Sequence, residues 1–106
     1  MAAAQIPLAK VDPVEADSHH YTVEFENEKV RVVRIKYGAR EKSVMHSHPE
    51  SVSVFLKDCK AKFTYPDGKS EEIEAKAGQV MHMEAFEHDP ENLGDAFELI
   101  QIEFKK

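Results

Sequence analysis

The fold of this chain is indicated most clearly by residues 61–75, AKFTYPDGKSEEIEA. Residues 61–65 form a short β-type run that ends at Pro66-Asp67-Gly68. Proline presets φ for the first corner of a turn, and glycine tolerates a positive φ at its end. Beyond the turn, residues 69–75 are polar and alternate around Ile73. The stretch therefore predicts a β-hairpin.

Short runs of the same kind continue on both sides of the hairpin, separated by turn residues at intervals of about 8–12 residues. The clearest runs are residues 21–25, 30–37, 44–48, 51–56, 79–83 and 97–104. In the last run Ile100, Ile102 and Phe104 share one face, and Leu99 lies on the other. No stretch of about 11 residues carries a clean helical stripe. The pattern predicts about eight or nine short strands in an all-β sandwich or barrel.

The chain is expected to form one domain, because its 106 residues are too few for two conventional cores. Residues 1–20 contain Pro7 and Pro13 and little apolar periodicity, which predicts an irregular N-terminal arm. Residues 21–106 are expected to form the β-barrel domain.

Composition and charge exclude several classes of function. The formal net charge is −6, so the basic surface of a nucleic-acid-binding protein is not expected. No apolar run approaches the roughly 18 residues of a membrane span. The single cysteine, Cys59, cannot form a disulfide within the chain, and its polar, turn-like setting predicts an incidental residue. With a lone thiol and no targeting segment, the expected location is the cytoplasm.

The six histidines are many for an acidic chain of this length. His46 and His48 are separated by one residue, so on a strand both imidazoles point to the same face and can converge on one metal ion. His88 is the candidate third ligand and is expected to arrive from a separate strand. A transition-metal site needs three or four such ligands, held rigidly. The spacing therefore predicts a metal site at these three residues.

The three histidines lie in motifs that resemble those of the cupins. The first motif combines a glycine, His-x-His and a β-strand, and it is matched by Gly38, His46, His48 and residues 51–56. The second combines a glycine, a histidine and an asparagine, and it is matched by Gly78, His88 and Asn92. Residues 30–104, most of the chain, resemble a small single-domain cupin of the RmlC-like, cupin-2 type. In detail, residues 48–49, 63–69, 77–80 and 91–92 look like small cupins linked to β-alanine degradation.

The resemblance implies a double-stranded β-helix, that is, a jelly-roll barrel of two antiparallel sheets, with the three histidines lining its interior. Such proteins are often dimeric. A small barrel of open sheets also leaves unpaired strand edges, which favour pairing with another chain. We therefore expect a homodimer, with residues 21–25 crossing the interface.

The sequence departs from the cupin pattern at the glutamate ligand. The family position falls on Ser51, Val52 or Ser53, none of which is a carboxylate. Glu50 is adjacent and could serve as an additional ligand only after a shift of register. The remaining set of three histidines, with water or substrate in the other positions, resembles the three-histidine cupins, which include thiol dioxygenases that use Fe(II).

The other histidines allow more than one interpretation. His82 lies on the run before His88 and could be a fourth ligand, an acid/base near the metal, or a core residue with a satisfied hydrogen bond. His19 and His20 lie in the arm beside Asp17 and are expected to be a solvated pair.

The histidines and the resemblance lead to one hypothesis of function and two alternatives. In the hypothesis, His46, His48 and His88 bind a divalent transition metal (Fe, Mn, Ni, Cu or Zn). This metal would act as a Lewis acid or an O₂-activating centre on a small organic acid inside the barrel. The first alternative is a sensor or carrier that binds metal or metabolite without turnover. The second is a degenerate cupin that only associates with a partner. No organic cofactor is expected.

Overall fold

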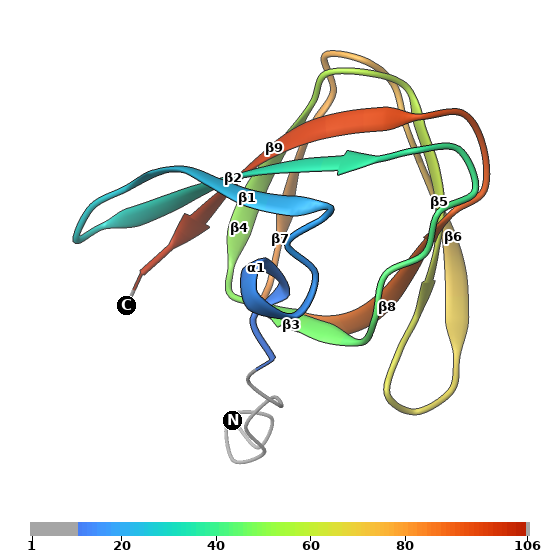
Figure 1. The fold of residues 1–106 in the computed structure, drawn as a ribbon, viewed down its shortest axis with the longest axis horizontal. Coiled ribbons are helices and arrows are strands. Elements are labelled where there is room, and N and C mark those ends of the chain that lie inside the picture. The colour runs from blue at the N-terminus through green and yellow to red at the C-terminus, as the bar shows by residue number, and fades with distance from the viewer. Residues whose placement is uncertain (1–10, 106) are drawn as a thin grey trace.

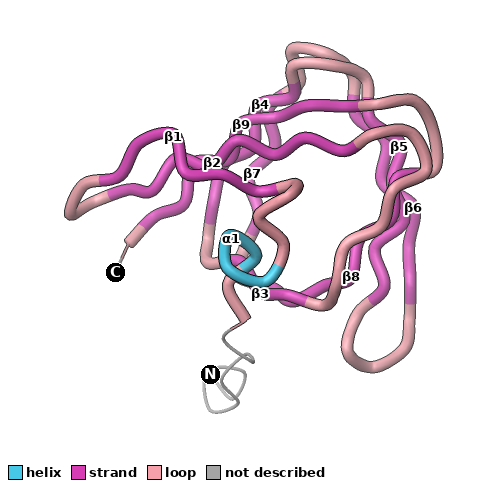
Figure 2. Tube along the Cα trace, in the orientation of Figure 1, coloured by secondary structure: helices cyan, strands magenta, loops and turns pink. Residues whose placement is uncertain are grey.

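The computed structural model describes residues 11–105, and these residues fold into two facing antiparallel sheets (Figure 1). Across this range the elements are α1 (Pro13–Ala16), β1 (Tyr21–Glu26), β2 (Val30–Tyr37), β3 (His46–His48), β4 (Ser51–Phe55), β5 (Cys59–Thr64), β6 (Ser70–Ala75), β7 (Val80–Met83), β8 (Phe86–Asn92) and β9 (Phe97–Phe104). The strand order is β1-β2-β9-β4-β7 in one sheet and β3-β8-β5-β6 in the other. The last strand, β9, lies between β2 and β4 (Figure 2). This architecture confirms the predicted jelly-roll barrel.

The predicted hairpin at residues 61–75 is formed by β5 and β6. Gly68 closes its turn with a φ of 88°, a conformation that glycine adopts without steric cost. Opposite charges face each other across the hairpin, because Lys60 pairs with Glu74 and Lys62 with Glu72. The turn residues and the cross-strand pairs thus specify the same register.

The barrel interior is apolar at one end and polar at the other. Alternate residues of β9 face inward, so this strand contributes Phe97 and Leu99 at one end and Gln101 and Glu103 at the other. The apolar end is completed by buried residues of the neighbouring strands, namely Val33, Ile35, Tyr37, Phe55, Cys59, Ala61 and Ala75. Burial of this apolar surface is the main stabilising contribution to the fold. The polar end is where the candidate site lies.

Cys59 is the first residue of β5 and only 7% of it is exposed, which corrects the expectation of an incidental turn cysteine. Its side chain shares the inner face with Ala61. Burial raises the pKa of the Cys59 thiol to about 11. Because the thiolate is the reactive form, this thiol is an inert part of the core.

Residues 11–20 of the expected arm are attached to the barrel, and residues 1–10 lie outside the described residues. The carboxylate of Asp12 accepts a hydrogen bond from the Val14 N–H at 3.0 Å, and Pro13 occupies the first helical position. The Val11 carbonyl accepts from the Ser47 N–H at 2.9 Å, which holds α1 against β3. The described part of the arm therefore contains an ordered helical turn where an irregular segment was expected, because Asp12-Pro13 provides both cap and helix start.

The outer face of the five-stranded sheet carries a row of apolar side chains. The strand register places Phe25, Val32, Ile102 and Val52 next to one another from β1 to β4, and we call these four residues the outer apolar row. Phe25 is 54% exposed. A solvated face of an antiparallel sheet ordinarily carries polar residues. Val32, Val52 and Ile102 are half-buried, so Phe25 is the exposed member of a contiguous apolar row, and such a row on a sheet face is a candidate interaction surface.

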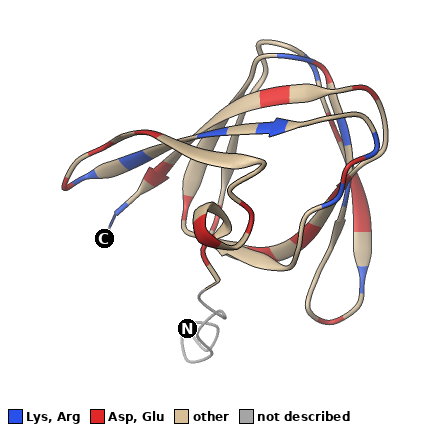
Figure 3. Cartoon of the chain, in the orientation of Figure 1, with Lys and Arg blue, Asp and Glu red and all other residues tan. Residues whose placement is uncertain are grey.

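Charged side chains are interspersed over the strands (Figure 3). Arg34, for example, pairs with Glu24 and Glu98 on the outer face of the same sheet. Exposed pairs of this kind contribute little to stability. Among residues 11–105, no helix has the length and apolar character needed to cross a membrane.

Candidate metal centre

Three buried histidines meet at the polar end of the barrel. β3 pairs with β8, and in this register His46 lies directly opposite His88. His48 is two residues beyond His46, so the pleat of the strand turns both to the same inner face. The exposed fractions are 0% for His46, 2% for His48 and 3% for His88. The structure thus brings all three predicted ligands together.

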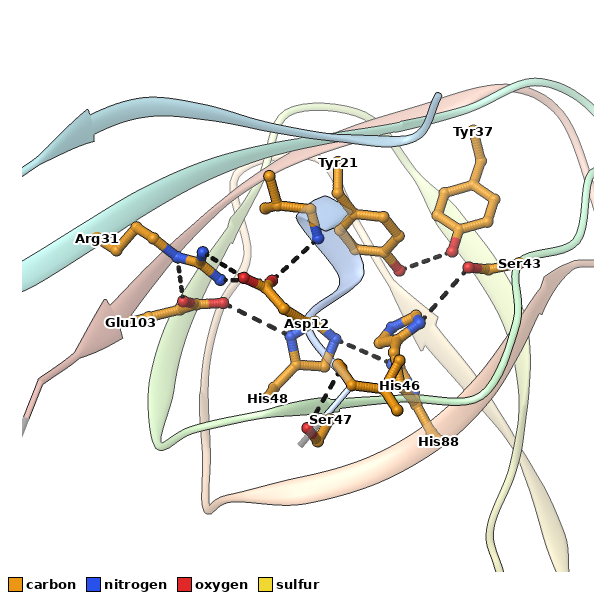
Figure 4. A network of polar contacts seen from close by, with 12 residues as sticks. Asp12, Tyr21, Arg31, Tyr37, Ser43, His46, Ser47, His48, His88 and Glu103 are labelled. Carbon is orange, nitrogen blue, oxygen red and sulfur yellow. Dashed lines mark hydrogen bonds and ion pairs between the residues drawn. The ribbon is translucent and has the colours of Figure 1, made fainter. Parts of the chain in front are cut away.

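The ligand atoms have the spacing that one metal ion requires. The Nε2 atom of His88 lies 3.1 Å from Nε2 of His46 and 3.1 Å from Nε2 of His48 (Figure 4). Two nitrogen ligands about 2.1 Å from a shared ion are about 3.0 Å apart at a right angle and about 3.4 Å apart at the tetrahedral angle. The donor set, three imidazoles, suits first-row transition metals. The residues present therefore fit a divalent transition metal.

The backbone fixes the tautomer of His46. Its Nδ1–H donates to the Val44 carbonyl at 2.7 Å, and because a carbonyl oxygen only accepts, Nε2 carries the lone pair. Burial lowers the pKa of His46 to about 4. Burial, together with the neighbouring imidazoles, also lowers the pKa of His88 far below its usual value. Both rings are therefore neutral near pH 7, which is the form that binds metal.

Glu103 lies behind His48 and was not among the predicted site residues. Its Oε2 atom is 3.7 Å from Nδ1 of His48, and its Oε1 atom accepts from Nε of Arg31 at 2.8 Å (Figure 4). Arg31 also holds Asp12 with two hydrogen bonds of 2.9 and 3.0 Å. Burial alone would raise the pKa of Glu103, but the contacts with His48 and Arg31 outweigh it and lower the pKa. A carboxylate behind a metal-binding histidine orients the ring and increases its basicity.

A small cavity adjoins the histidine cluster inside the barrel. Its volume is about 60 Å³, and His48 and His88 form part of its wall. The other wall residues are mainly apolar and include Phe55, Phe63, Met81 and Met83. One water molecule needs about 10–15 Å³ of such space, so the cavity has room for a few waters or a ligand of a few heavy atoms.

Two tyrosine hydroxyls meet in the wall of this cavity, and the sequence analysis did not single them out. The hydroxyls of Tyr21 and Tyr37 are 2.6 Å apart, and the Tyr21 ring centre lies 4.9 Å from that of His46. Burial raises the pKa of both tyrosines well above the usual value. Both hydroxyls are therefore protonated; one donates to the other, and the second proton remains available to another acceptor.

Glu50 and His82 are not brought to the three-histidine cluster. Nε2 of His82 lies 2.7 Å from a carboxylate oxygen of Glu50, and the His82 side chain is 50% exposed. In the pairing of β4 with β7, His82 lies opposite Val52, on the outer face of the sheet. Together with Glu84 the two residues form a separate exposed group. This placement separates them from His46 and its neighbours.

His20 is buried, which corrects the expectation of a solvated pair. It is 6% exposed, and its ring stacks on Tyr37 with 4.1 Å between the ring centres. Its two ring nitrogens contact carboxylate oxygens of Asp17 at 2.6 Å and Glu41 at 2.9 Å. The side chain of His19 remains 75% exposed, as expected. His20 differs because Tyr37 and Glu41, distant in sequence, cover it.

Comparison with solved structures finds the same architecture elsewhere. A cupin domain from Bordetella pertussis Tohama I has a TM-score of 0.74 and 25% identity, over 81% of this chain and 92% of that one. A cupin superfamily protein from Desulfitobacterium hafniense DCB-2 has a TM-score of 0.61 and 15% identity, over 81% and 76%. A structure of Fe(II)-HppE with an alternative substrate has a TM-score of 0.60 and 11% identity, over 79% and 48%. No protein-family model and no curated protein matches the sequence.

Proposed function

We propose that this chain, which has the cupin fold, is a metal-dependent enzyme that acts on a small organic acid inside its barrel. His46, His48 and His88 would hold one divalent transition metal. The observation that carries the proposal is the convergence of three buried Nε2 atoms, with 3.1 Å contacts, next to an interior cavity whose wall includes His48 and His88.

Three protein ligands leave coordination positions open for water or substrate, which is the arrangement of catalytic sites. When bound there, a divalent metal supplies Lewis acidity or, in the case of iron, activation of O₂. Because a protein of the same fold holds Fe(II), iron is the first metal to test. Iron, manganese, nickel, copper and zinc all suit three imidazoles.

The cavity wall limits the kind of substrate. Among its described residues there is no lysine or arginine to pair with a carboxylate. The hydrogen-bonding groups are the Tyr21 and Tyr37 hydroxyls and the side chains of Ser53 and Gln101. Apolar side chains form most of the rest of the wall. A short acid with an apolar body and one or two polar groups fits this wall.

The metal claim is tested on protein purified without a histidine tag. We expect metal to co-purify with the wild type and one equivalent of it to be lost in His46→Ala. The matched control is His82→Ala, which removes an exposed histidine outside the cluster and should retain the metal. Wild-type protein without stoichiometric metal, or His46→Ala that retains as much metal as the wild type, would contradict the proposal.

The catalytic claim is tested by oxygen consumption. The iron-loaded protein is incubated with thiols, diketones and amino acids, including β-alanine because of the sequence resemblance to cupins linked to its degradation. Substrate-dependent consumption that is absent in His46→Ala supports an oxygenase. Metal binding without any turnover would instead support the second candidate, a non-catalytic sensor or carrier. The cavity volume of about 60 Å³, small for a substrate site, is the observation that favours this candidate.

We also infer a homodimer in the cytoplasm. The outer apolar row and the β1 edge supply an apolar, unpaired surface to a second copy of the chain. A mass of one chain in light scattering at micromolar concentration would refute the dimer.

A further inference from the structure

A second cluster of metal-binding side chains lies outside the barrel, where the arm meets the loop after β2. It consists of His19 and His20 from the arm and Glu41 from the loop. We propose that these three residues form a second divalent transition-metal site, independent of the three-histidine cluster.

The ligand atoms of this group are already close together. Nε2 of His20 lies 2.9 Å from Oε1 of Glu41, and Nε2 of His19 lies 3.8 Å from Oε2 of the same carboxylate. All three ligand atoms lie within 4.8 Å of one another. Ligands about 2.1 Å from an ion are about 3.0 Å apart at a right angle and about 4.2 Å apart when opposite. A small rotation of the exposed His19 ring is enough to complete the set.

His20 is held in the orientation of a metal ligand. Its Nδ1 lies 2.6 Å from Asp17 Oδ2 and its Nε2 lies 2.9 Å from Glu41 Oε1, so Asp17 would hold the ring while an ion at Nε2 takes the place of the proton shared with Glu41. Its ring is stacked on Tyr37, with an angle of 6° between the ring planes. Glu41 is fixed as well, because its Oε1 atom accepts from the Gly38 N–H at 2.7 Å. Two of the three ligands therefore lose little freedom on binding.

The site differs from the inner cluster in composition and exposure. Two imidazoles and one carboxylate suit zinc, nickel, copper or cobalt. The His19 and Glu41 side chains are 75% and 42% exposed, so water can fill the open positions. A metal here links the arm to the loop after β2 and stabilises the attachment of α1. In the competing arrangement, His20 is a protonated ring between two carboxylates and no metal binds.

The test is a Zn²⁺ titration of metal-free protein in competition with a chromophoric chelator. We expect two equivalents in the wild type, and one equivalent weakened by more than about tenfold in His19→Ala and in Glu41→Gln. The control is His82→Ala, which disrupts the exposed Glu50–His82–Glu84 group and should leave both equivalents unchanged. His19→Ala is the cleaner variant, because Glu41 also supports the Gly38 backbone.

A second measurement assigns the site without any substitution. Zn²⁺ beyond the first equivalent should shift the ring ¹⁵N signals of His19 and His20 and leave that of His82 in place. Binding of only one equivalent, or a second equivalent unaffected by His19→Ala, would overturn the proposal. Loss of the second equivalent in His82→Ala would also overturn it. The inner cluster is assessed separately with His46→Ala, which should abolish the equivalent that binds there. If His46→Ala changes neither equivalent, the proposed three-histidine centre is wrong and the second site is unaffected by that result.

Discussion

Glu103→Gln tests whether the buried carboxylate behind His48 supports both the fold and the metal centre. The carboxylate accepts from Arg31 Nε at 2.8 Å with one oxygen and faces His48 Nδ1 at 3.7 Å with the other. Glutamine has one acceptor oxygen and one NH₂ group, so it cannot present an oxygen to both Arg31 Nε and His48 Nδ1. One of these two nitrogens then faces the NH₂ group in place of a carboxylate oxygen.

The expected losses of stability and metal affinity in Glu103→Gln follow from the contacts that Arg31 and His48 keep. A hydrogen bond to a charged group contributes about 1.5–3 kcal/mol. Arg31 keeps both hydrogen bonds to Asp12, so the larger cost of an unpaired buried charge is avoided. We expect the free energy of unfolding of the metal-free protein to fall by about 1.5–3 kcal/mol. Metal affinity should fall by about 10–100-fold, as is usual when a histidine ligand loses its outer partner.

The assay is urea denaturation of chelator-treated protein, followed by competitive titration with Zn²⁺. The matched control is Glu98→Gln, the same substitution on the same strand, at a carboxylate that pairs with Arg34 on the outer face. This variant should have a much smaller effect on stability and none on metal affinity. If Glu103→Gln behaves like Glu98→Gln in both measurements, the carboxylate does not support the site.

Three further predictions follow from burial and surface chemistry. The metal-free protein should lose stability as the pH falls from 6.5 to 4, because the pKa of His46 is about 4 in the folded state and the unfolded chain takes up a proton at higher pH. Urea midpoints at pH 7.5 and 5 measure this loss of stability, and His46→Gln should reduce it. Cys59, with a thiol pKa of about 11, should react with iodoacetamide far more slowly at pH 8 in native protein than in urea; equal rates would contradict its burial. Phe25→Ser should convert the expected dimer to a monomer, as measured by light scattering, without unfolding the barrel, as measured by circular dichroism. The same substitution at the exposed Leu56 is the control and should leave the protein dimeric.

Local rules predicted the strands and the placement of the first two candidate ligands. His46 and His48 are two residues apart, and the pleat alone places them on one face. The hairpin at residues 61–75 follows from its turn residues. The sequence predicted that His88 lies on a strand but did not predict where that strand begins and ends. Pro90 and the acidic residues around it conceal the alternation of inner and outer residues along β8.

The polar inner face of β9 and the burial of His20 depend on long-range packing and could not be predicted from the sequence. The apolar residues Ile100, Ile102 and Phe104 of β9 lie on its outer face, whereas its inner face becomes polar from Gln101 onward. The register places Arg31 and Ser51 beside Glu103. His20 is buried only because Glu41, 21 residues away, and the ring of Tyr37 close over it. Such contacts depend on tertiary structure and leave no short motif.

The brevity of β3 has a consequence for how this centre can be lost in evolution. The strand has three residues, two of which are proposed ligands, and among the described strands it pairs only with β8. A one-residue slip turns every side chain of a strand to its other face. A slip of β3 by one residue against β8 would therefore carry both histidines to the outside, whereas the pairing of the five-stranded sheet and of the β5–β6 hairpin does not involve β3. Under the proposed function, such a slip would remove two candidate ligands at once and leave the rest of the barrel paired.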